Sequence, residues 1–403
     1  MTTLDINLAT TLLLAIAVLF IGGAVRSIVK PLRDYNVPVP VVGGLIFAIS
    51  TSLLYAVFDI QLSFDMRMKT PLMLAFFISI GLSANLKLLI KGGKTLLIFL
   101  VVVTVFLIVQ DAVGVATAMA LDLHPLVGLL SSSITLSGGH GTGAAYAEKF
   151  GDIQNIQGGM ELAMACATFG LIIGGIIGGP VAQRLIARHK LQATTTAREP
   201  EDTAVELREV LGQISSQTIL EIVFIVTLCL IIGGALYGFF AGSAFTLPVF
   251  IWSLFIGVII RNVSELTGVY KIHADTLDTV GRLSLSVFLA LALMSLRLWE
   301  LLDLAGPLLI MMSVQTAAIV LFASFVTYRV MGSNYDSAIM SAGHCGFAMG
   351  ATPTAVANME AVTARYGPSP QAFLVIPMVG AFFIDLTNAL VIQAYLSLPL
   401  FGF

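Results

Sequence analysis

The stretch Ser137-Gly-Gly-His-Gly-Thr-Gly143 decides the fold, because a related stretch, Ser341-Ala-Gly-His-Cys-Gly-Phe347, follows it at an offset of 204 residues (341 minus 137). Each lies in a segment rich in Gly, Ser and Thr, at 125–150 and 335–366, whose apolar limbs are too short to cross a bilayer. Irregular backbone at membrane depth is tolerated only where protein buries it or where it lines a cavity. Both segments are therefore predicted to be re-entrant hairpins, which enter and leave on the same side.

The composition places the rest of the chain in a membrane. Of the 403 residues, 58% are hydrophobic and 11% are charged, and the mean hydropathy is +0.98, whereas soluble domains carry about 25% charged residues. These values exclude a soluble enzyme and a disordered chain. The net charge of −3 provides no basic footprint for nucleic acid, so no nucleic-acid partner is expected.

Ten apolar stretches are long enough to be transmembrane helices, which need about 20 residues. Their uniform apolarity distinguishes them from the alternating strands of a membrane barrel. The first lacks a basic leader and a small-residue cleavage site, so we interpret it as a retained helix and not as a signal peptide. The ten predicted spans are 6–25, 38–58, 71–89, 95–121, 156–182, 217–241, 246–264, 283–301, 306–328 and 370–397.

Basic residues predict the orientation of these spans. With the N-terminus outside, 16 of the 20 Lys and Arg residues fall in cytoplasmic segments, in agreement with the positive-inside rule. Both termini are then periplasmic. The charged segment 183–216 becomes a cytoplasmic linker, which we interpret as a solvated connector.

The linker separates two similar halves, 1–182 and 217–403, each predicted to have five spans and one hairpin. Gln110 in the first half matches Gln315 in the second at nearly the same offset as the glycine-rich stretches. Because five is odd, the second half starts on the opposite side of the membrane, and the repeats are inverted. The predicted fold is therefore an all-α polytopic membrane protein with two inverted five-helix repeats, which is typical of secondary transporters with sites at the midplane.

The two hairpin tips are predicted to carry the substrate site. Glycine lets the backbone approach a ligand closely, and the N–H groups of such turns attract anions. Thr142 and Thr352-Pro353-Thr354 are predicted to open the return limbs, so that two helix N-termini face an anionic substrate. Two alternatives stay open: the glycines serve only close helix packing, and the two His are hydrogen-bonded core residues. The candidate substrate-binding residues are Ser137, Gly138, Gly139, His140, Gly141, Thr142, Gly143, Ser341, Gly343, His344, Cys345, Gly346, Thr352 and Thr354.

Polar residues inside the spans are candidates for a cation site, because ionisable groups at membrane depth are usually functional. Asp385 lies in the middle of the last span, three residues before Asn388, so both side chains share one helix face. Such oxygen donors suit a hard cation such as Na⁺, and proton binding by the carboxylate is the alternative. Asp111, Gln110 and Gln315 complete the candidate sodium-binding set. The His and Cys residues lack the spacing of a zinc site.

Five longer stretches carry a resemblance to a known family: Ser137-Gly-Gly-His-Gly-Thr-Gly-Ala-Ala145, Glu161-Leu-Ala-Met-Ala-Cys-Ala-Thr-Phe169, Ala342-Gly-His-Cys-Gly-Phe347, Gly350-Ala-Thr-Pro-Thr-Ala355 and Pro377-Met-Val-Gly-Ala-Phe-Phe-Ile-Asp385. Together they resemble the bacterial sodium/glutamate symporter family over nearly the whole chain. The resemblance implies uptake of L-glutamate, and of D-glutamate or close analogues, coupled to Na⁺ across the bacterial inner membrane. It also implies hairpin tips that carry the site, a homodimer and elevator-like alternating access, with no enzymatic activity and no cofactor besides Na⁺ as coupling ion.

Other functions are weighed against this one. Within transport, the alternative is a proton- or Na⁺-coupled carrier of citrate-like dicarboxylates. An intramembrane aspartyl protease would use Asp111 and Asp385, but neither has a Gly-x-Gly-Asp flank, and the His-Glu-x-x-His motif of zinc enzymes does not occur. A channel is compatible with the broken helices, and its currents would greatly exceed the turnover of a carrier.

Overall fold

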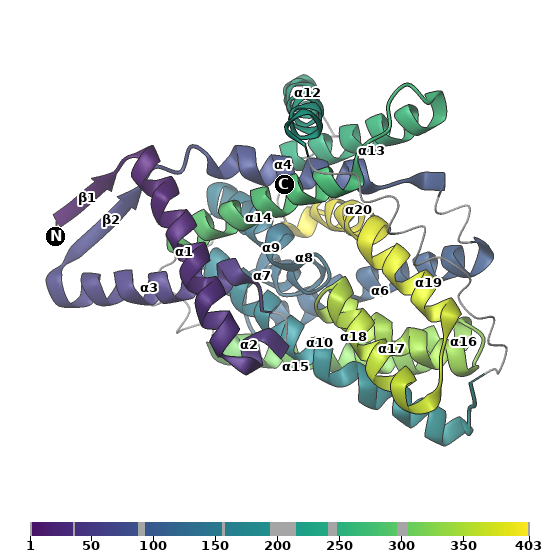
Figure 1. The fold of residues 1–403 in the computed structure, drawn as a ribbon. Coiled ribbons are helices and arrows are strands. Elements are labelled where there is room, and N and C mark those ends of the chain that lie inside the picture. The colour runs from purple at the N-terminus through teal and green to yellow at the C-terminus, as the bar shows by residue number, and fades with distance from the viewer. Residues whose placement is uncertain are drawn as a thin grey trace. The chain divides into compact units, whose positions relative to one another are not determined.

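The computed structural model describes residues 2–34, 37–87, 93–154, 158–193, 215–240, 248–295 and 305–401. Almost all of these residues are helical (Figure 1). Most of the predicted linker 183–216 lies outside the described residues, and its first part continues a helix that ends at His189.

The helices are named in their order along the chain. In the first part of the chain they are α1 (Leu8–Ile28), α2 (Lys30–Asp34), α3 (Val39–Phe58), α4 (Lys69–Ser83), α6 (Gly93–Ala120), α7 (Pro125–Leu130), α8 (Ser133–Leu136), α9 (Gly139–Gln154) and α10 (Gly159–His189). In the second part they are α12 (Ser216–Phe240), α13 (Val249–Thr267), α14 (Ala274–Met294), α15 (Ala305–Phe322), α16 (Tyr328–Val330), α17 (Tyr335–Met349), α18 (Thr352–Tyr366), α19 (Pro370–Met378) and α20 (Ile384–Leu396). Two single π-helical turns, η2 (Ala323–Thr327) and η3 (Val379–Phe383), interrupt the last long helices, and a 3₁₀ turn, η4 (Pro399–Phe401), follows α20.

Seven helical segments of the described chain are long and apolar enough to cross a membrane: Leu8–Ile28, Gly93–Ala120, Gly159–His189, Ser216–Phe240, Val249–Thr267, Ala274–Met294 and Gly306–Val330. The protein is therefore a polytopic membrane protein. Each of the ten predicted spans overlaps a helix, but those at 38–58, 71–89 and 370–397 correspond to shorter or interrupted apolar helices. The count of ten spans stays a prediction.

The structure contains a small sheet that the predicted all-α fold did not include. Strand β1 (Thr2–Ile6) pairs in parallel with β2 (Ile60–Phe64), in a register that places Leu4 opposite Leu62. Parallel strands need a long crossover connection, and here α1 and α3 provide it. Gly43 lets these helices pack closely, because a Cβ at this position would overlap the carbonyl oxygen of Val18.

The chain forms two compact units. One contains Met1–Lys69, Gly92–Ala193 and Ser286–Phe403, and the other contains Thr70–Lys91 and Thr194–Leu285. In the second unit, α4, α12, α13 and the start of α14 enclose an apolar core. The fully enclosed members of that core include Ile78, Leu82, Ile222, Cys229 and Leu277.

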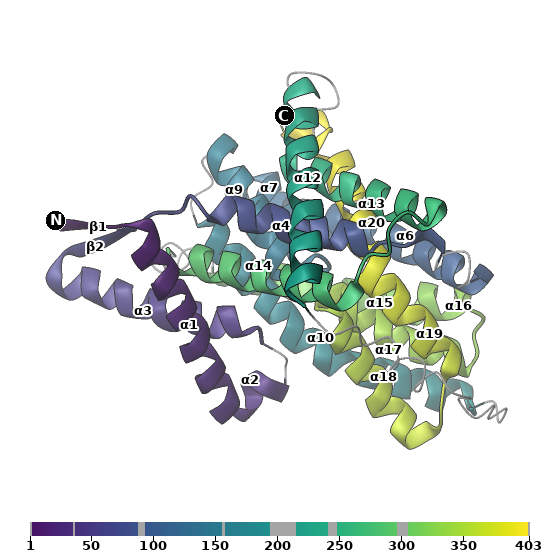
Figure 2. The same cartoon turned by 45° about the horizontal axis from the view of Figure 1, so that its top comes forward.

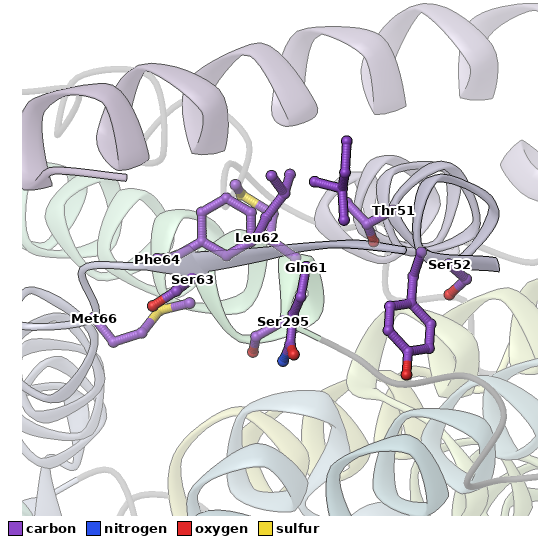
Figure 3. Close-up of a pocket in the computed structure, with 11 residues that line it drawn as sticks. Thr51, Ser52, Gln61, Leu62, Ser63, Phe64, Met66 and Ser295 are labelled. Atoms are coloured by element: carbon purple, nitrogen blue, oxygen red, sulfur yellow. The ribbon is translucent and has the colours of Figure 1, made fainter. Parts of the chain in front are cut away.

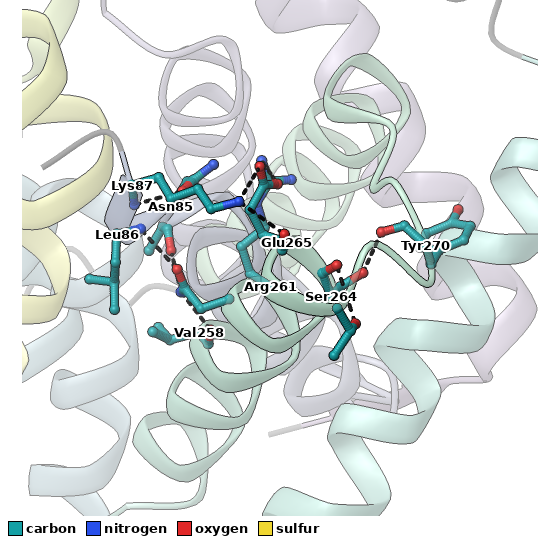
Figure 4. A network of polar contacts seen from close by, with 11 residues as sticks. Asn85, Leu86, Lys87, Val258, Arg261, Ser264, Glu265 and Tyr270 are labelled. Atoms are coloured by element: carbon teal, nitrogen blue, oxygen red, sulfur yellow. Dashed lines mark hydrogen bonds and ion pairs between the residues drawn. The ribbon is translucent and has the colours of Figure 1, made fainter. Parts of the chain in front are cut away.

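Polar contacts hold the end of α4 to α13 within the second unit (Figure 4). The Leu86 amide donates to Asn262 Oδ1 at 2.9 Å, and Asn262 Nδ2 donates to the Ala84 carbonyl at 2.9 Å. Lys87 Nζ donates to the backbone carbonyl of Glu265 at 3.0 Å. These contacts therefore link the residues that follow α4 to α13.

In the first unit, α10 packs along α17 and α18 (Figure 2). Helix α17 is almost wholly enclosed, because all of its residues except Asp336 are buried. Small residues allow this proximity: a Cβ on Gly346 would lie 2.5 Å from Ala355 Cα, and one on Gly178 would lie 2.7 Å from the Ala342 carbonyl oxygen. The enclosed α17 carries the second of the two glycine-rich stretches.

Candidate functional site

The first glycine-rich stretch lies at a break between helices. Helix α8 ends at Leu136, Ser137 follows it, and α9 begins at Gly139, whose φ of +70° is one that L side chains rarely adopt. Gly138 is closely enclosed as well, since a Cβ there would lie 2.7 Å from the Ile134 carbonyl oxygen. The sequence therefore predicted this break correctly.

The second break lies beyond the stretch that was expected to form it. Residues 341–347 are within α17, and the helix stops only at Met349, with Gly350 and Ala351 in non-helical conformations. The structure thus places the helix break at 350–351 and not within 341–347, where the sequence predicted a hairpin tip; the re-entrant hairpin itself stays a prediction. Gly343 and Gly346 serve close packing, as one of the sequence-based alternatives held; a Cβ on Gly343 would lie 2.9 Å from Ile376 Cγ2.

The return limb of the second break starts where predicted. Helix α18 begins at Thr352 with Pro353 in its first turn. Its N-cap position is Ala351, which provides no side-chain acceptor for the first N–H groups of the helix. The hydroxyl oxygen of Thr354, a residue only 4% exposed, has no hydrogen-bond partner in the part of the chain that the structure describes. The start of α18 thus combines an uncapped helix N-terminus with a buried hydroxyl that has no partner among the described residues, two features that suit an anionic group.

The two breaks meet through side-chain contacts. Ser137 Oγ donates to Gln110 Oε1 at 2.8 Å, and Gln110 Nε2 donates at 2.9 Å to the carbonyl of Ala348, near the end of α17. Gly170 of α10 lies between the breaks: a Cβ there would overlap the Met349 carbonyl oxygen and lie 2.9 Å from Leu136 Cδ2. The structure thus brings Ser137 and Gln110 together beside the second break.

A buried polar group lies next to this contact. Asp111, fully buried on α6, accepts hydrogen bonds through Oδ1 from Ser132 Oγ at 2.7 Å and from the Ser133 amide at 3.0 Å. The Ser133 carbonyl accepts from Asn388 Nδ2 at 3.0 Å, which connects α20 to the same point. We name Asp111, Ser132, Ser133 and Asn388 the Asp111 cluster.

Several oxygens of this cluster lack donors. Asp111 Oδ2, Ser133 Oγ and Asn388 Oδ1 have no hydrogen-bond partner among the described residues, and each residue is at most 1% exposed. A buried acceptor without a donor costs about 1–3 kcal/mol, and more when it is charged. One carboxylate oxygen, one hydroxyl and one amide oxygen are ligands suited to a hard cation. These three oxygen ligands therefore fit Na⁺ as a transported ion.

Gln315 lies beside the cluster. Its Nε2 donates to the Gln110 carbonyl at 2.9 Å, and its buried Oε1 has no partner in the described structure. Gly114 separates it from the cluster, because a Cβ on Gly114 would lie 2.7 Å from Ser132 Cβ and 3.0 Å from Gln315 Nε2. Of the predicted ion-site residues, Asp111 and Asn388 are joined through Ser133, and Gln110 and Gln315 are adjacent to them.

Asp385 is placed differently from the other candidates. It lies in the first turn of α20, directly after η3, and its side chain is half-buried. Within the described part of the chain, no hydrogen bond or ion pair connects it to Asp111 or Asn388. The geometry therefore favours Asp111 over Asp385 as the central carboxylate of a cation site.

The two equivalent His residues have different surroundings. His140 lies in the first turn of α9, and its Nε2 is 3.1 Å from Oγ1 of Thr168 on α10. His344 Nδ1 lies 2.8 Å from Thr327 Oγ1, and its ring is enclosed by the rings of Phe99, Phe106, Phe322 and Phe347 at centroid distances of 5.2 to 6.0 Å. His344 is thus a core residue, whereas His140 lies at the break itself.

The other predicted substrate-site residues show the same difference between the two glycine-rich stretches. Gly141, Thr142 and Gly143 lie in the first turns of α9, whereas Ser341 and Cys345 are fully buried inside α17. Ser341 Oγ donates to the Ser337 carbonyl at 2.8 Å, within its own helix. Thr352 packs against Gly380, where a Cβ would lie 2.8 Å from Thr352 Oγ1.

Sequence reasoning missed Ser132 and Ser133. The available signal was the run Ser131-Ser132-Ser133 inside an apolar limb, since hydroxyls at membrane depth commonly bond to neighbouring helices. The sequence did not reveal that Asp111 was their partner.

A cavity of about 260 Å³ lies elsewhere in the same unit, beside β2 (Figure 3). Its polar lining consists of uncharged groups such as Thr51, Ser52, Gln61, Ser63 and Ser295. None of the predicted site residues lines it, and it offers no charge for an ion. The Asp111 cluster and the two breaks are therefore the better candidate site.

Broken helices that lie beside buried, unpartnered oxygens, with an uncapped helix start close by, are typical of secondary membrane transporters. Comparison with known proteins specifies the family. The model of the sodium/glutamate symporter family matches residues 4–368. The sodium/glutamate symporter of Escherichia coli (strain K12) is 48% identical over 396 residues, which cover 97% of this chain and 98% of that protein. The sodium/glutamate symporter of Haemophilus influenzae is 48% identical over 385 residues, 95% of each chain. The chain belongs to the sodium/glutamate symporter family, a family of transporters and not of enzymes.

Proposed function

We propose that this protein is a multi-pass carrier of the bacterial inner membrane that takes up glutamate together with Na⁺. Family membership supports the activity, and the donor-deficient oxygens of the Asp111 cluster are the observation that supports a cation site. Reconstituted protein should accumulate labelled L-glutamate when an inward Na⁺ gradient is imposed. Accumulation driven equally by a proton gradient without Na⁺ would contradict Na⁺ coupling. Uptake of labelled citrate that unlabelled glutamate does not inhibit would contradict glutamate as the substrate.

The coupling ion is proposed to bind at the Asp111 cluster. A Na⁺ ion among Asp111 Oδ2, Ser133 Oγ and Asn388 Oδ1 would offset the buried negative charge, which is unfavourable without a counter-ion. Gln315 Oε1 is a further ligand candidate on the same side. The role of Asp385 is proposed to be secondary, in the path of the ion and not at its binding point.

The substrate is proposed to bind where α9 and α18 begin. A carboxylate of glutamate would accept hydrogen bonds from the uncapped N–H groups of α18 and from the Thr354 hydroxyl. His140 and Thr142 in the first turns of α9 would face the same ligand. The Ser137–Gln110–Ala348 contacts connect this place to the Asp111 cluster, so that ion and substrate would support each other's binding.

Thr354 tests the substrate proposal. Thr354→Val removes the unpartnered hydroxyl and keeps the side-chain shape, so we expect the KM for glutamate to rise about tenfold, equivalent to ~1.4 kcal/mol. Thr363→Val is the matched control on the same helix, because the Thr363 hydroxyl donates to the Met359 carbonyl at 2.9 Å. Equal KM values for the two variants would contradict a substrate contact by Thr354.

The transport cycle is proposed to be elevator-like alternating access in a homodimer with inverted repeats and periplasmic termini. The family resemblance and the excess of basic residues in the expected cytoplasmic segments support this part. Light-scattering mass in detergent would test the dimer, and labelling of a cysteine added at residue 4 in intact cells would test the orientation. The mass of a monomer would contradict the homodimer. Failure of a membrane-impermeant reagent to label the added cysteine in intact cells would contradict a periplasmic N-terminus.

A further inference from the structure

A groove of about 680 Å³ runs between the C-terminal half of α10 and the segment formed by α15, η2 and α16. It is distinct from the Asp111 cluster and from both helix breaks, because it shares no residue with them. One part of its wall is apolar. The apolar residues that line it include Ile176, Ile177, Val181, Val320, Leu321 and Phe325.

The other part of the wall is basic. Arg184 and Arg188 are four residues apart on α10 and so share one helix face, and Arg329 of α16 lines the same groove. All three side chains are exposed, and none forms an ion pair with another residue of the described chain. The Arg329 guanidinium lies 5.7 Å from the centre of the Phe325 ring, at the boundary between the basic and apolar parts.

Part of the apolar wall is exposed among the residues that the structure describes. Leu321 is 56% exposed, Phe325 is 47% exposed and Ile176 is 46% exposed. These residues belong to helices long enough to cross the membrane, so acyl chains are their natural neighbours. The groove thus combines an acyl-chain surface with three guanidinium groups at a helix end.

We propose that this groove is a binding site for an anionic phospholipid. The three arginines would hold the phosphate through charge-assisted, bidentate hydrogen bonds, and one acyl chain would lie along Ile176, Leu321 and Phe325. Basic pockets between transmembrane helices bind such headgroups in other membrane proteins. A small free anion would use only the basic part and would leave the apolar wall without a partner.

The position of the groove also gives the lipid an effect. Ser324 and Phe325, which line it, belong to the π-helical turn η2. Thr327 of the same turn contacts His344 Nδ1 at 2.8 Å, and His344 lies inside the enclosed helix α17. A bound lipid would therefore stabilise the α10–η2 contact and, through Thr327, the packing of α17.

Thermal unfolding of the full-length, detergent-purified protein tests the proposal, with added phosphatidylglycerol, phosphatidylcholine or inorganic phosphate. We expect phosphatidylglycerol to raise the Tm and phosphatidylcholine to leave it nearly unchanged. The triple variant R184Q/R188Q/R329Q should require at least about tenfold more phosphatidylglycerol for the same shift. The matched control R67Q/R282Q/R365Q removes three exposed arginines elsewhere and should respond as the wild type does.

A second variant distinguishes a lipid from a free anion. I176S/L321S leaves the arginines in place, so it should weaken the phosphatidylglycerol response and leave any response to inorganic phosphate unchanged. Equal responses of the triple variant and the wild type would overturn the proposal, as would equal shifts with the two lipids.

Discussion

The two glycine-rich stretches share a sequence pattern but have different structures. In the first, the chain breaks at the pattern itself, and Gly139 has a positive φ. In the second, the pattern is buried inside α17, and the break follows at 350–351. The same residue types therefore serve a turn in one half and close helix packing in the other. A repeat detected in sequence does not establish that matched residues have the same role.

The His pair should show the largest difference between the two breaks. His344→Ala removes a ring that four Phe side chains enclose, and buried aromatic rings stabilise a fold by about 3–5 kcal/mol relative to Ala. His140→Ala removes a ring at the break and should reduce stability by less than about 1.5 kcal/mol while it impairs glutamate uptake. Thermal unfolding and uptake measured on both variants check this. A larger loss of stability for His140→Ala would contradict the difference in their surroundings.

Gly170 tests whether the two breaks must lie against each other. Gly170→Ala places a methyl group on the Met349 carbonyl oxygen, and overpacking of this kind typically costs about 1–3 kcal/mol. Gly179→Ala is the control on the same helix, because a Cβ there meets nothing within 4 Å. We expect a lower Tm and slower uptake for the first variant only. Similar Tm values and uptake rates for the two variants would show that close contact between the breaks is not needed for stability or transport.

The equivalent serines should show the smallest contrast. Ser137→Ala leaves Gln110 Oε1 without its donor, which should cost about 1 kcal/mol and reduce uptake several-fold. Ser341→Ala removes a hydroxyl that donates mainly within its own helix, at 2.8 Å to the Ser337 carbonyl, so its uptake should stay within about twofold of wild type. Initial uptake rates at equal protein density measure both effects. A weaker effect for Ser137→Ala would remove it from the functional contact.

Local features of the chain predicted much of this structure. Long apolar stretches predicted the seven helices that are long enough to cross a membrane. Thr352-Pro353 predicted the start of α18. Both signals lie in consecutive residues of the chain. The β1–β2 sheet was missed because its strands pair across two intervening helices, with Thr2 opposite Ile60. Ser132 and Ser133 were missed because their partner Asp111 lies on another helix, about 20 positions earlier. The position of the second break depends on how tightly α17 packs, which no local pattern records.

The central claim is that the Asp111 cluster binds the coupling ion. Na⁺ titration of glutamate uptake by Asp111→Asn, beside Asp385→Asn and wild type, tests it most directly. Replacing the carboxylate removes the only charged ligand of the cluster in the described chain, so Asp111→Asn should lose Na⁺-stimulated uptake or require at least about 30-fold more Na⁺, equivalent to ~2 kcal/mol. Asp385→Asn should retain a Na⁺ dependence closer to that of wild type. A wild-type Na⁺ dependence in Asp111→Asn, with the dependence lost in Asp385→Asn, would contradict the account.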